Sequence, residues 1–209
     1  SVNPFREYLH GELNTPLTPN TTYYVEYYVH RMTYGIAIDQ YSAHFSTFPV
    51  TDMPADGVLN LTPEVMNSNG IITDFEWVRI SGCFTANGGE EFIILGNFLP
   101  NDQTDTMNIS ANPQKHYALI DDVGVYELAS LVPNDTVIIE GEIIGLNTDL
   151  PITYFVNGVE ITNGIFSASE IGVFEIEVFL EECGFMGSFI VEILPCEVVA
   201  AEYQTPFSD

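Results

Sequence analysis

The feature that most constrains this chain is a side-chain period of two, which recurs in nearly every apolar segment. The segment YYVEYYVH (23–30) divides into an apolar set and a mixed set: Tyr23, Val25, Tyr27 and Val29 against Tyr24, Glu26, Tyr28 and His30. Successive residues of a β-strand point to opposite faces, so one set should enter a core and the other should lie on an outer face. The chain should therefore fold as an all-β protein.

Further segments with this pattern follow along the chain, separated by clusters of Asn, Asp, Gly and Pro. In the first part they are residues 41–47, 75–86, 91–98 and 116–128. No segment has a convincing helical period, and TPEVMNSNG (62–70) predicts at most one short helical turn in a connecting loop. We expect about six strands in residues 1–128.

A domain boundary is predicted near ASLVPNDT (129–136), where a long strand ends in a Pro-containing turn. Short strands follow in quick succession beyond it, and Asn-Gly at 157–158 and at 163–164 is typical of tight hairpins. We therefore predict a first domain over 1–130, a small sandwich of immunoglobulin-like build over 131–199, and a tail over 200–209.

The charge balance limits the possible partners. The 209 residues include 30 Asp and Glu but only 4 Lys and Arg, for a net charge of -26. Such a surface repels phosphate, so we expect no nucleic-acid partner and no attraction to anionic membranes. No stretch reaches the ~18 apolar residues of a membrane helix, so we expect no membrane insertion. The charge is explained either by a secreted protein adapted to salty water or by bound divalent metal, for which calcium suits the plentiful oxygen ligands.

The cysteines form no CxxC pair, so a zinc site of the usual spacing is not expected. Cys183 and Cys196 flank a predicted strand that would hold them roughly 30 Å apart at ~3.3 Å per residue, so no bridge should join them unless that strand bends back. Because the chain begins with Ser1 and not with Met, we expect a processed product or a fragment.

Residues 1–128 resemble a known family. REYLHGELNTPLTPNTTYYVEYYV, YGIAIDQYSAHFS, WVRISGCFTANGGEEFIILGNF and YALIDDVGVYEL occur in this order, as in galactose-binding-like jelly-roll domains of large bacterial surface proteins. Those domains are similar to carbohydrate-binding modules and often lie beside immunoglobulin-like modules in proteins exported by the type IX secretion system. The resemblance implies a jelly-roll β-sandwich, an extracellular or cell-surface location and a structural or adhesive role.

Two adjacent acids, Asp121 and Asp122, interrupt an otherwise apolar predicted strand. The resemblance implies that the carboxylate matching Asp121 ligates a structural calcium at the edge of the sandwich, and Asp122 would share the site. A buried carboxylate without a partner would cost several kcal/mol, which a cation would offset. The alternative is that both acids lie at a bulge or strand end and accept backbone N–H groups.

A jelly roll needs about eight strands, whereas about six are expected here, and the family's opening strands would lie before Ser1. We therefore expect the sandwich to be incomplete and completed in trans by another copy or another surface protein, through strand addition to an open sheet edge. Residues 200–209 could donate such a strand, although a tail of this composition is more often disordered.

Sugar binding is the alternative function. Aromatic rings stack on sugar faces, and Tyr24, Glu26, Tyr28 and His30 offer aromatic and polar groups on one strand face. Trp77, Tyr41 and His44 are further candidates, although the aromatics could equally serve cross-strand packing, and Trp77 suits the core. We expect no enzyme, because no nucleophile elbow, His-Glu-X-X-His or phosphate loop is present.

The family's proteins also carry O-glycans on Asp-Thr-aliphatic motifs. DTM (105–107) and DTV (135–137) resemble this motif, which implies glycans on Thr106 and Thr136 in loops.

Overall fold

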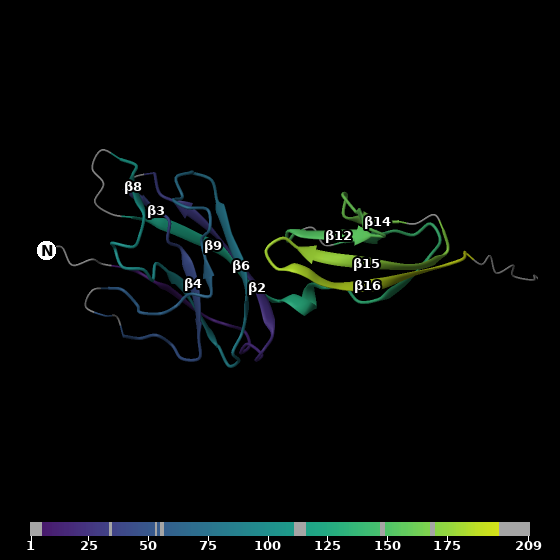
Figure 1. Cartoon of the computed structure of the whole chain (residues 1–209), viewed down its shortest axis with the longest axis horizontal. Helices are drawn as coiled ribbons and strands as arrows, with labels where there is room; N and C mark the ends of the chain where they lie inside the picture. Colours follow the sequence, from purple (N-terminus) through teal and green to yellow (C-terminus); the bar gives the residue numbers. More distant parts are fainter. Residues whose placement is uncertain are drawn as a thin grey trace, which may run out of the picture. The chain divides into compact units, whose positions relative to one another are not determined.

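The computed structural model describes residues 6–33, 35–52, 54, 57–110, 116–146, 149–167 and 170–196. The chain divides into two compact units, Ser1–Leu131 and Val132–Asp209, one residue beyond the predicted boundary. The regular elements of the described ranges are strands and one short 3-10 helix, η1 (Leu128–Leu131), so the protein is all-β (Figure 1). No helix within these ranges is long and apolar enough to cross a membrane.

The first unit is a β-sandwich built from strands of very unequal length. They are β1 (Leu9–Glu12), β2 (Thr22–Arg31), β3 (Ile36–Ile38), β4 (Ser42–Ser46), β5 (Val65–Met66), β6 (Val78–Thr85), β7 (Phe92–Gly96), β8 (Thr106–Asn108) and β9 (Ala118–Glu127). One sheet has the order β1-β7-β4-β5, the other has the order β6-β2-β9, and β3 pairs separately with β8. The longer strands alternate between the two sheets along the chain, as they do in a jelly roll.

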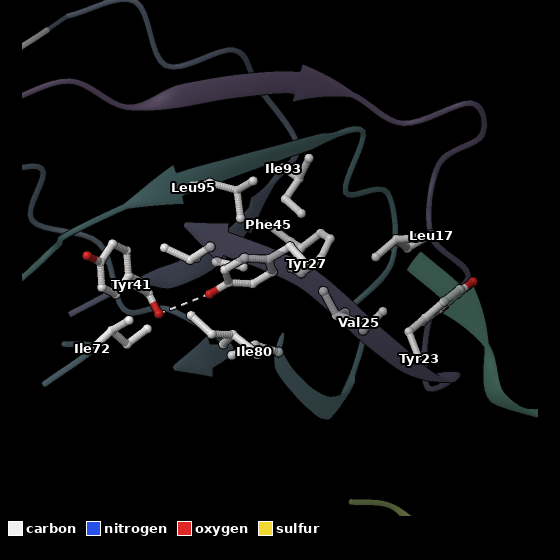
Figure 2. Close-up of a cluster of buried hydrophobic side chains, with 14 of the residues drawn as sticks. Leu17, Tyr23, Val25, Tyr27, Tyr41, Phe45, Ile72, Ile80, Ile93 and Leu95 are labelled. Atoms are coloured by element: carbon white, nitrogen blue, oxygen red, sulfur yellow. Dashed lines mark hydrogen bonds between the residues drawn. The ribbon is translucent and has the colours of Figure 1, made fainter. Parts of the chain in front are cut away.

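Strand β2 is the centre of the three-stranded sheet, and its inward residues supply much of the core. All four of them are buried: Tyr23, Val25, Tyr27 and Val29. Figure 2 shows Tyr23, Val25 and Tyr27 among side chains of the opposite sheet, including Phe45 and Ile93. Each fully buried apolar side chain stabilises the fold by roughly 1.5–3 kcal/mol. The buried Tyr27 hydroxyl donates to the Tyr41 carbonyl at 3.0 Å, so it has a partner.

The two borders of this sandwich differ. At one border the edge strands β5 and β6 approach closely: a Cβ built on Gly82 would lie 3.1 Å from Cγ1 of Val65, so glycine permits the contact. At the other border, within the part of the chain that the structure describes, the edge strands β1 and β9 pair only with β7 and β2, respectively. One border is therefore closed by packing, and the other is bounded by two free edges.

Two expectations for this unit are wrong. Nine strands form in the described residues of this unit where about six were expected, because β1, β3, β5 and β8 are too short to give a periodic pattern. The shortage of strands from which an incomplete sandwich was expected therefore does not occur. Residues 62–70 form no helical turn, since they contain β5, which pairs with β4 through Ala43↔Val65. The N–H of Glu64 also donates to the Ala43 carbonyl at 3.0 Å, which fixes the segment at the sheet edge.

The second unit is a smaller sandwich. Its strands are β10 (Thr136–Ile139), β11 (Ile144–Gly145), β12 (Ile152–Val156), β13 (Val159–Glu160), β14 (Ile165–Phe166), β15 (Gly172–Leu180) and β16 (Gly184–Leu194). Five of them form a sheet of order β10-β16-β15-β12-β13, while β11 pairs with β14. Strand β10 runs parallel to β16 and the other pairs are antiparallel, and this two-sheet arrangement is immunoglobulin-like.

Of the two Asn-Gly pairs that predicted hairpins, only the first forms one. Asn157 and Gly158 have φ values of 51° and 74°, and they join β12 to β13 in the predicted hairpin. The second predicted hairpin, at Asn163-Gly164, is wrong, because the strand that follows it pairs with β11. Phe166 and Leu146 are both buried in the core of this unit.

The closed border gives a stability test. We expect Gly82→Ala to destabilise the protein by about 1–3 kcal/mol, because the added methyl group would press β5 away from β6. Gly145→Ala is the matched control, since nothing lies within 4 Å of its Cβ position. Urea unfolding followed by circular dichroism measures both variants. A Gly82→Ala protein as stable as the control would contradict the close packing of this border.

Candidate functional site

The acid pair lies at a β-bulge in β9. The pairing of β2 with β9 passes from Glu26↔Gly124 to Tyr28↔Asp121, so Asp122 and Val123 share one position opposite Tyr27. Asp122 has a φ of 50°, and its N–H donates to Oδ1 of Asp121 at 2.9 Å. Both acids are exposed. The structure thus agrees with the alternative prediction in that both residues lie at a bulge, where the Asp121 carboxylate accepts a backbone N–H.

The pair alone does not complete a calcium shell. Calcium takes 6–8 oxygen ligands, and the described part of the chain contains no group of three or more His, Cys, Asp and Glu side chains placed to hold a metal ion. Backbone carbonyls and water would have to supply most of the shell around Asp121 and Asp122. Calcium binding therefore stays a prediction, and these two carboxylates are the residues that would hold the ion.

The four residues of β2 predicted to bind sugar, Tyr24, Glu26, Tyr28 and His30, lie on the outer face of the β6-β2-β9 sheet, opposite the core. Tyr24 and Glu26 are buried there, at 0% and 8% exposure, and the Tyr24 hydroxyl donates to Oε2 of Glu26 at 2.9 Å. The Tyr24 ring also stacks against Tyr126 of β9 with 6.3 Å between centroids. These two residues therefore have partners within the protein, which accords with the packing alternative.

The other end of the same face is more open. Tyr28 and His30 are half-buried, and His30 lies against Trp77, with 5.3 Å between their ring centroids. Trp77 is 44% exposed, so its predicted core placement is wrong. Nδ1 of His30 is buried and has no hydrogen-bond partner among the described residues. This end combines an accessible indole ring with the half-buried ring of Tyr28.

The remaining aromatic candidates lie elsewhere. Tyr41 is buried in the core, and its hydroxyl is 3.1 Å from Nε2 of His116. His44 lies on β4 in the other sheet, with Nδ1 3.1 Å from Oε2 of Glu64. Burial alone would lower the pKa of His44, but the hydrogen bond and the charge of Glu64 raise it above its usual value. Neither Tyr41 nor His44 joins the face that carries Trp77.

Negative charge collects around Tyr126 on this outer face. Burial is the largest cause that raises the pKa of the Tyr126 hydroxyl. The charges of Glu26 and Asp122 and the Tyr28 hydroxyl raise that pKa further. The shift indicates that these groups lie near one another, so the centre of the face disfavours anionic ligands.

A groove at the open border is the site that sequence reasoning missed. It has a volume of about 610 Å³ and runs between β1 and β9. Leu9 and Val123 in its wall are 54% and 44% exposed, and the half-buried Ile120 and Val125 continue into the core. The only signal in the sequence was the alternation of Leu9, Gly11 and Leu13, which is too short to distinguish a strand from a loop.

The two predicted glycosylation positions lie at strand starts and not in loops, which corrects that expectation. Thr106 begins β8 and is exposed, whereas Thr136 begins β10 and is half-buried.

Among the cysteines, Cys196 is free and exposed. The Cys183–Cys196 bridge is therefore not formed, as expected from their separation along the strand.

Comparison with known proteins adds no family assignment. No protein-family model matches the chain, and no curated protein matches it.

The calcium prediction can be tested on the intact chain. If Asp121 and Asp122 hold calcium, a chelator should lower the unfolding temperature reported by the fluorescence of Trp77, because a ligand bound only to the folded state stabilises it. Asp121→Asn should produce the same decrease of several degrees and abolish the effect of the chelator. Asp102→Asn removes an exposed acid elsewhere in the unit and should do neither. An unfolding temperature that responds to neither chelator nor Asp121→Asn would end the calcium hypothesis.

Proposed function

We propose that this protein is a non-catalytic structural or adhesive module of an extracellular assembly, in which a β-strand of a neighbouring copy adds to the open border of the first unit. The groove between β1 and β9 is the observation that carries this proposal. Its two walls are edge strands of different sheets, and edge strands present unpaired backbone groups to a partner strand.

The groove has the features that strand addition requires. Strand β9 has 10 residues, so its free edge is long enough for a partner of ordinary strand length. Leu9 and Val123 expose apolar surface beside this edge. A strand laid between the walls would cover that surface with alternate side chains, while its backbone satisfied the edge of β9.

The neighbouring copy is the favoured donor because no other surface protein is needed for the assembly. Residues 200–209, AAEYQTPFSD, are the donor segment suggested by the sequence, and they lie outside the described residues. With a net charge of -26, copies repel one another at low ionic strength. Assembly by this route should therefore strengthen as salt increases.

The assembly prediction rests on one exposed side chain. Val123→Lys places a charge in the groove and should keep the protein monomeric, whereas the unaltered chain should gain mass with concentration in sedimentation velocity at moderate salt. Val173→Lys is the control, because Val173 is an exposed valine in β15 of the second unit, outside the groove. Removal of residues 200–209 should also prevent assembly.

Two results would contradict this proposal. One is an unaltered chain that stays monomeric at every concentration and salt level. The other is a Val123→Lys protein that assembles as readily as Val173→Lys. If only the truncation has no effect, the groove accepts a strand from another segment.

A carbohydrate-binding module is the second candidate function, supported by the open end of the outer face. Trp77, directly before β6, offers an accessible ring that contacts His30 of β2, and Tyr28 lies two residues from His30 on the same face of β2. A sugar ring could stack on the accessible Trp77 ring, while the half-buried Tyr28 adds a second ring and a hydroxyl on the same face.

On this second candidate, Trp77→Ala and Tyr28→Ala should each weaken binding on a glycan array at least about tenfold, because each removes a stacking ring. Met66→Ala is the control, since Met66 is 56% exposed on β5 of the other sheet. A glycan that binds Trp77→Ala and Met66→Ala equally well would exclude this face as the binding site.

A further inference from the structure

The outer face of the five-stranded sheet in the second unit carries an aromatic ring between two acids. Phe155 of β12 pairs directly with Glu160 of β13 on one side and with Glu177 of β15 on the other. Residues directly opposite one another in a sheet place their side chains on the same face. The three strands therefore present a row in which one phenyl ring has a carboxylate on each side.

A second aromatic residue, Phe179, lies two residues after Glu177 on β15. Phe179 lies 5.4 Å from Phe155 between ring centroids, at an interplanar angle of 84°. The two rings belong to a groove of about 660 Å³ whose wall also contains Ile152, Glu177 and Glu181. Neither ring is part of the core of this unit, which is formed by the opposite face of the sheet.

The groove carboxylates are not neutralised within the described part of the chain. Glu160, Glu177 and Glu181 are exposed, and no hydrogen bond or ion pair joins them to any described residue. By contrast, Glu175 on the same strand accepts a hydrogen bond from Ser188 at 2.6 Å. The sequence of 132–209 contains no Lys, Arg or His at all, so the unit has no side chain of its own with which to pair them.

The floor of the groove decides which kind of cation fits. A divalent metal ion requires a shell of oxygen ligands, whereas Phe155 and Phe179 provide none. The described residues also include no cluster of acids close enough to bind a metal ion. An organic cation suits both parts of the groove, because it is attracted to the face of an aromatic ring and to a carboxylate beside it.

We propose that this groove binds arginine or lysine side chains of a basic partner polypeptide. The cationic group lies over the Phe155 ring and pairs with Glu177 or Glu160, while its aliphatic stem packs against Phe179. Arginine is the preferred residue, because its planar guanidinium group stacks on an aromatic ring and binds a carboxylate through two N–H groups. This site is independent of the groove between β1 and β9.

The test uses the full chain and a labelled octapeptide of alternating Arg and Ala, with binding followed by fluorescence anisotropy at low and physiological ionic strength. The same peptide with citrulline in place of arginine controls for shape without charge. Glu177→Gln removes one groove carboxylate and Phe155→Leu removes the ring. Glu192→Gln is the matched control, because Glu192 is an exposed acid on the same sheet that pairs with Val137 and Val173, outside the groove.

Binding of the arginine peptide should weaken about tenfold in Glu177→Gln and about fivefold in Phe155→Leu, and less than twofold in Glu192→Gln. The citrulline peptide should bind none of the proteins. Because Glu177 is exposed, Glu177→Gln should unfold at the temperature of the unaltered chain, so its result stands even if Phe155→Leu folds poorly. The proposal is overturned if the unaltered chain does not bind the arginine peptide, or if Glu192→Gln weakens binding as much as Glu177→Gln does.

Discussion

The bulge in β9 is the constraint on which the first unit depends. Strict alternation from Ile120 would carry Asp122 onto the core face and Val123 and Val125 onto the outer face. The extra residue at the bulge resets the alternation, so that Ile120 and Val125 both pack against the core while Asp121 and Asp122 remain exposed. Burying an unpaired carboxylate would cost several kcal/mol, and the positive φ of Asp122 costs much less, about 1–3 kcal/mol.

The same bulge shapes the open border. It directs Val123 toward the groove, where this valine and Leu9 of β1 leave apolar surface exposed. It also interrupts the regular edge of β9, and such interruptions are a common way to limit uncontrolled strand pairing. A donor strand must therefore match an irregular edge, which would make the proposed assembly selective for its own segment.

Charge acts in opposite directions at the two proposed binding sites. Addition of a strand from another copy brings two acidic chains together, so added salt should favour it. Binding of a basic peptide to the second unit relies on attraction, so added salt should weaken it. The contrast follows from the sequence, because all 4 Lys and Arg residues precede the second unit. The direction in which added salt changes an observed association thus indicates which of the two surfaces is responsible.

Much of the architecture could be predicted from the sequence, because period-two segments such as 23–30 are long enough to define a strand and both of its faces. The all-β fold follows from that period, and the hairpin at Asn157-Gly158 follows from local backbone preference. Strands β1, β3, β5 and β8 could not be predicted, because strands of two to four residues depend on pairing with neighbours remote in sequence. Likewise, the period of two placed Tyr24, Glu26, Tyr28 and His30 on one face. It did not indicate that Tyr24 is buried there whereas His30 is only half-buried.

The sequence by itself determined the class of fold, the acidity of both units and the absence of basic side chains beyond residue 131, since these depend only on composition and on local alternation. Tertiary structure alone decided which border of the first sandwich is open, that Trp77 is exposed beside His30, and that Phe155 lies between Glu160 and Glu177. Strand order and register bring these residues together, and both are set by side-chain packing over long sequence separations, which no local pattern encodes.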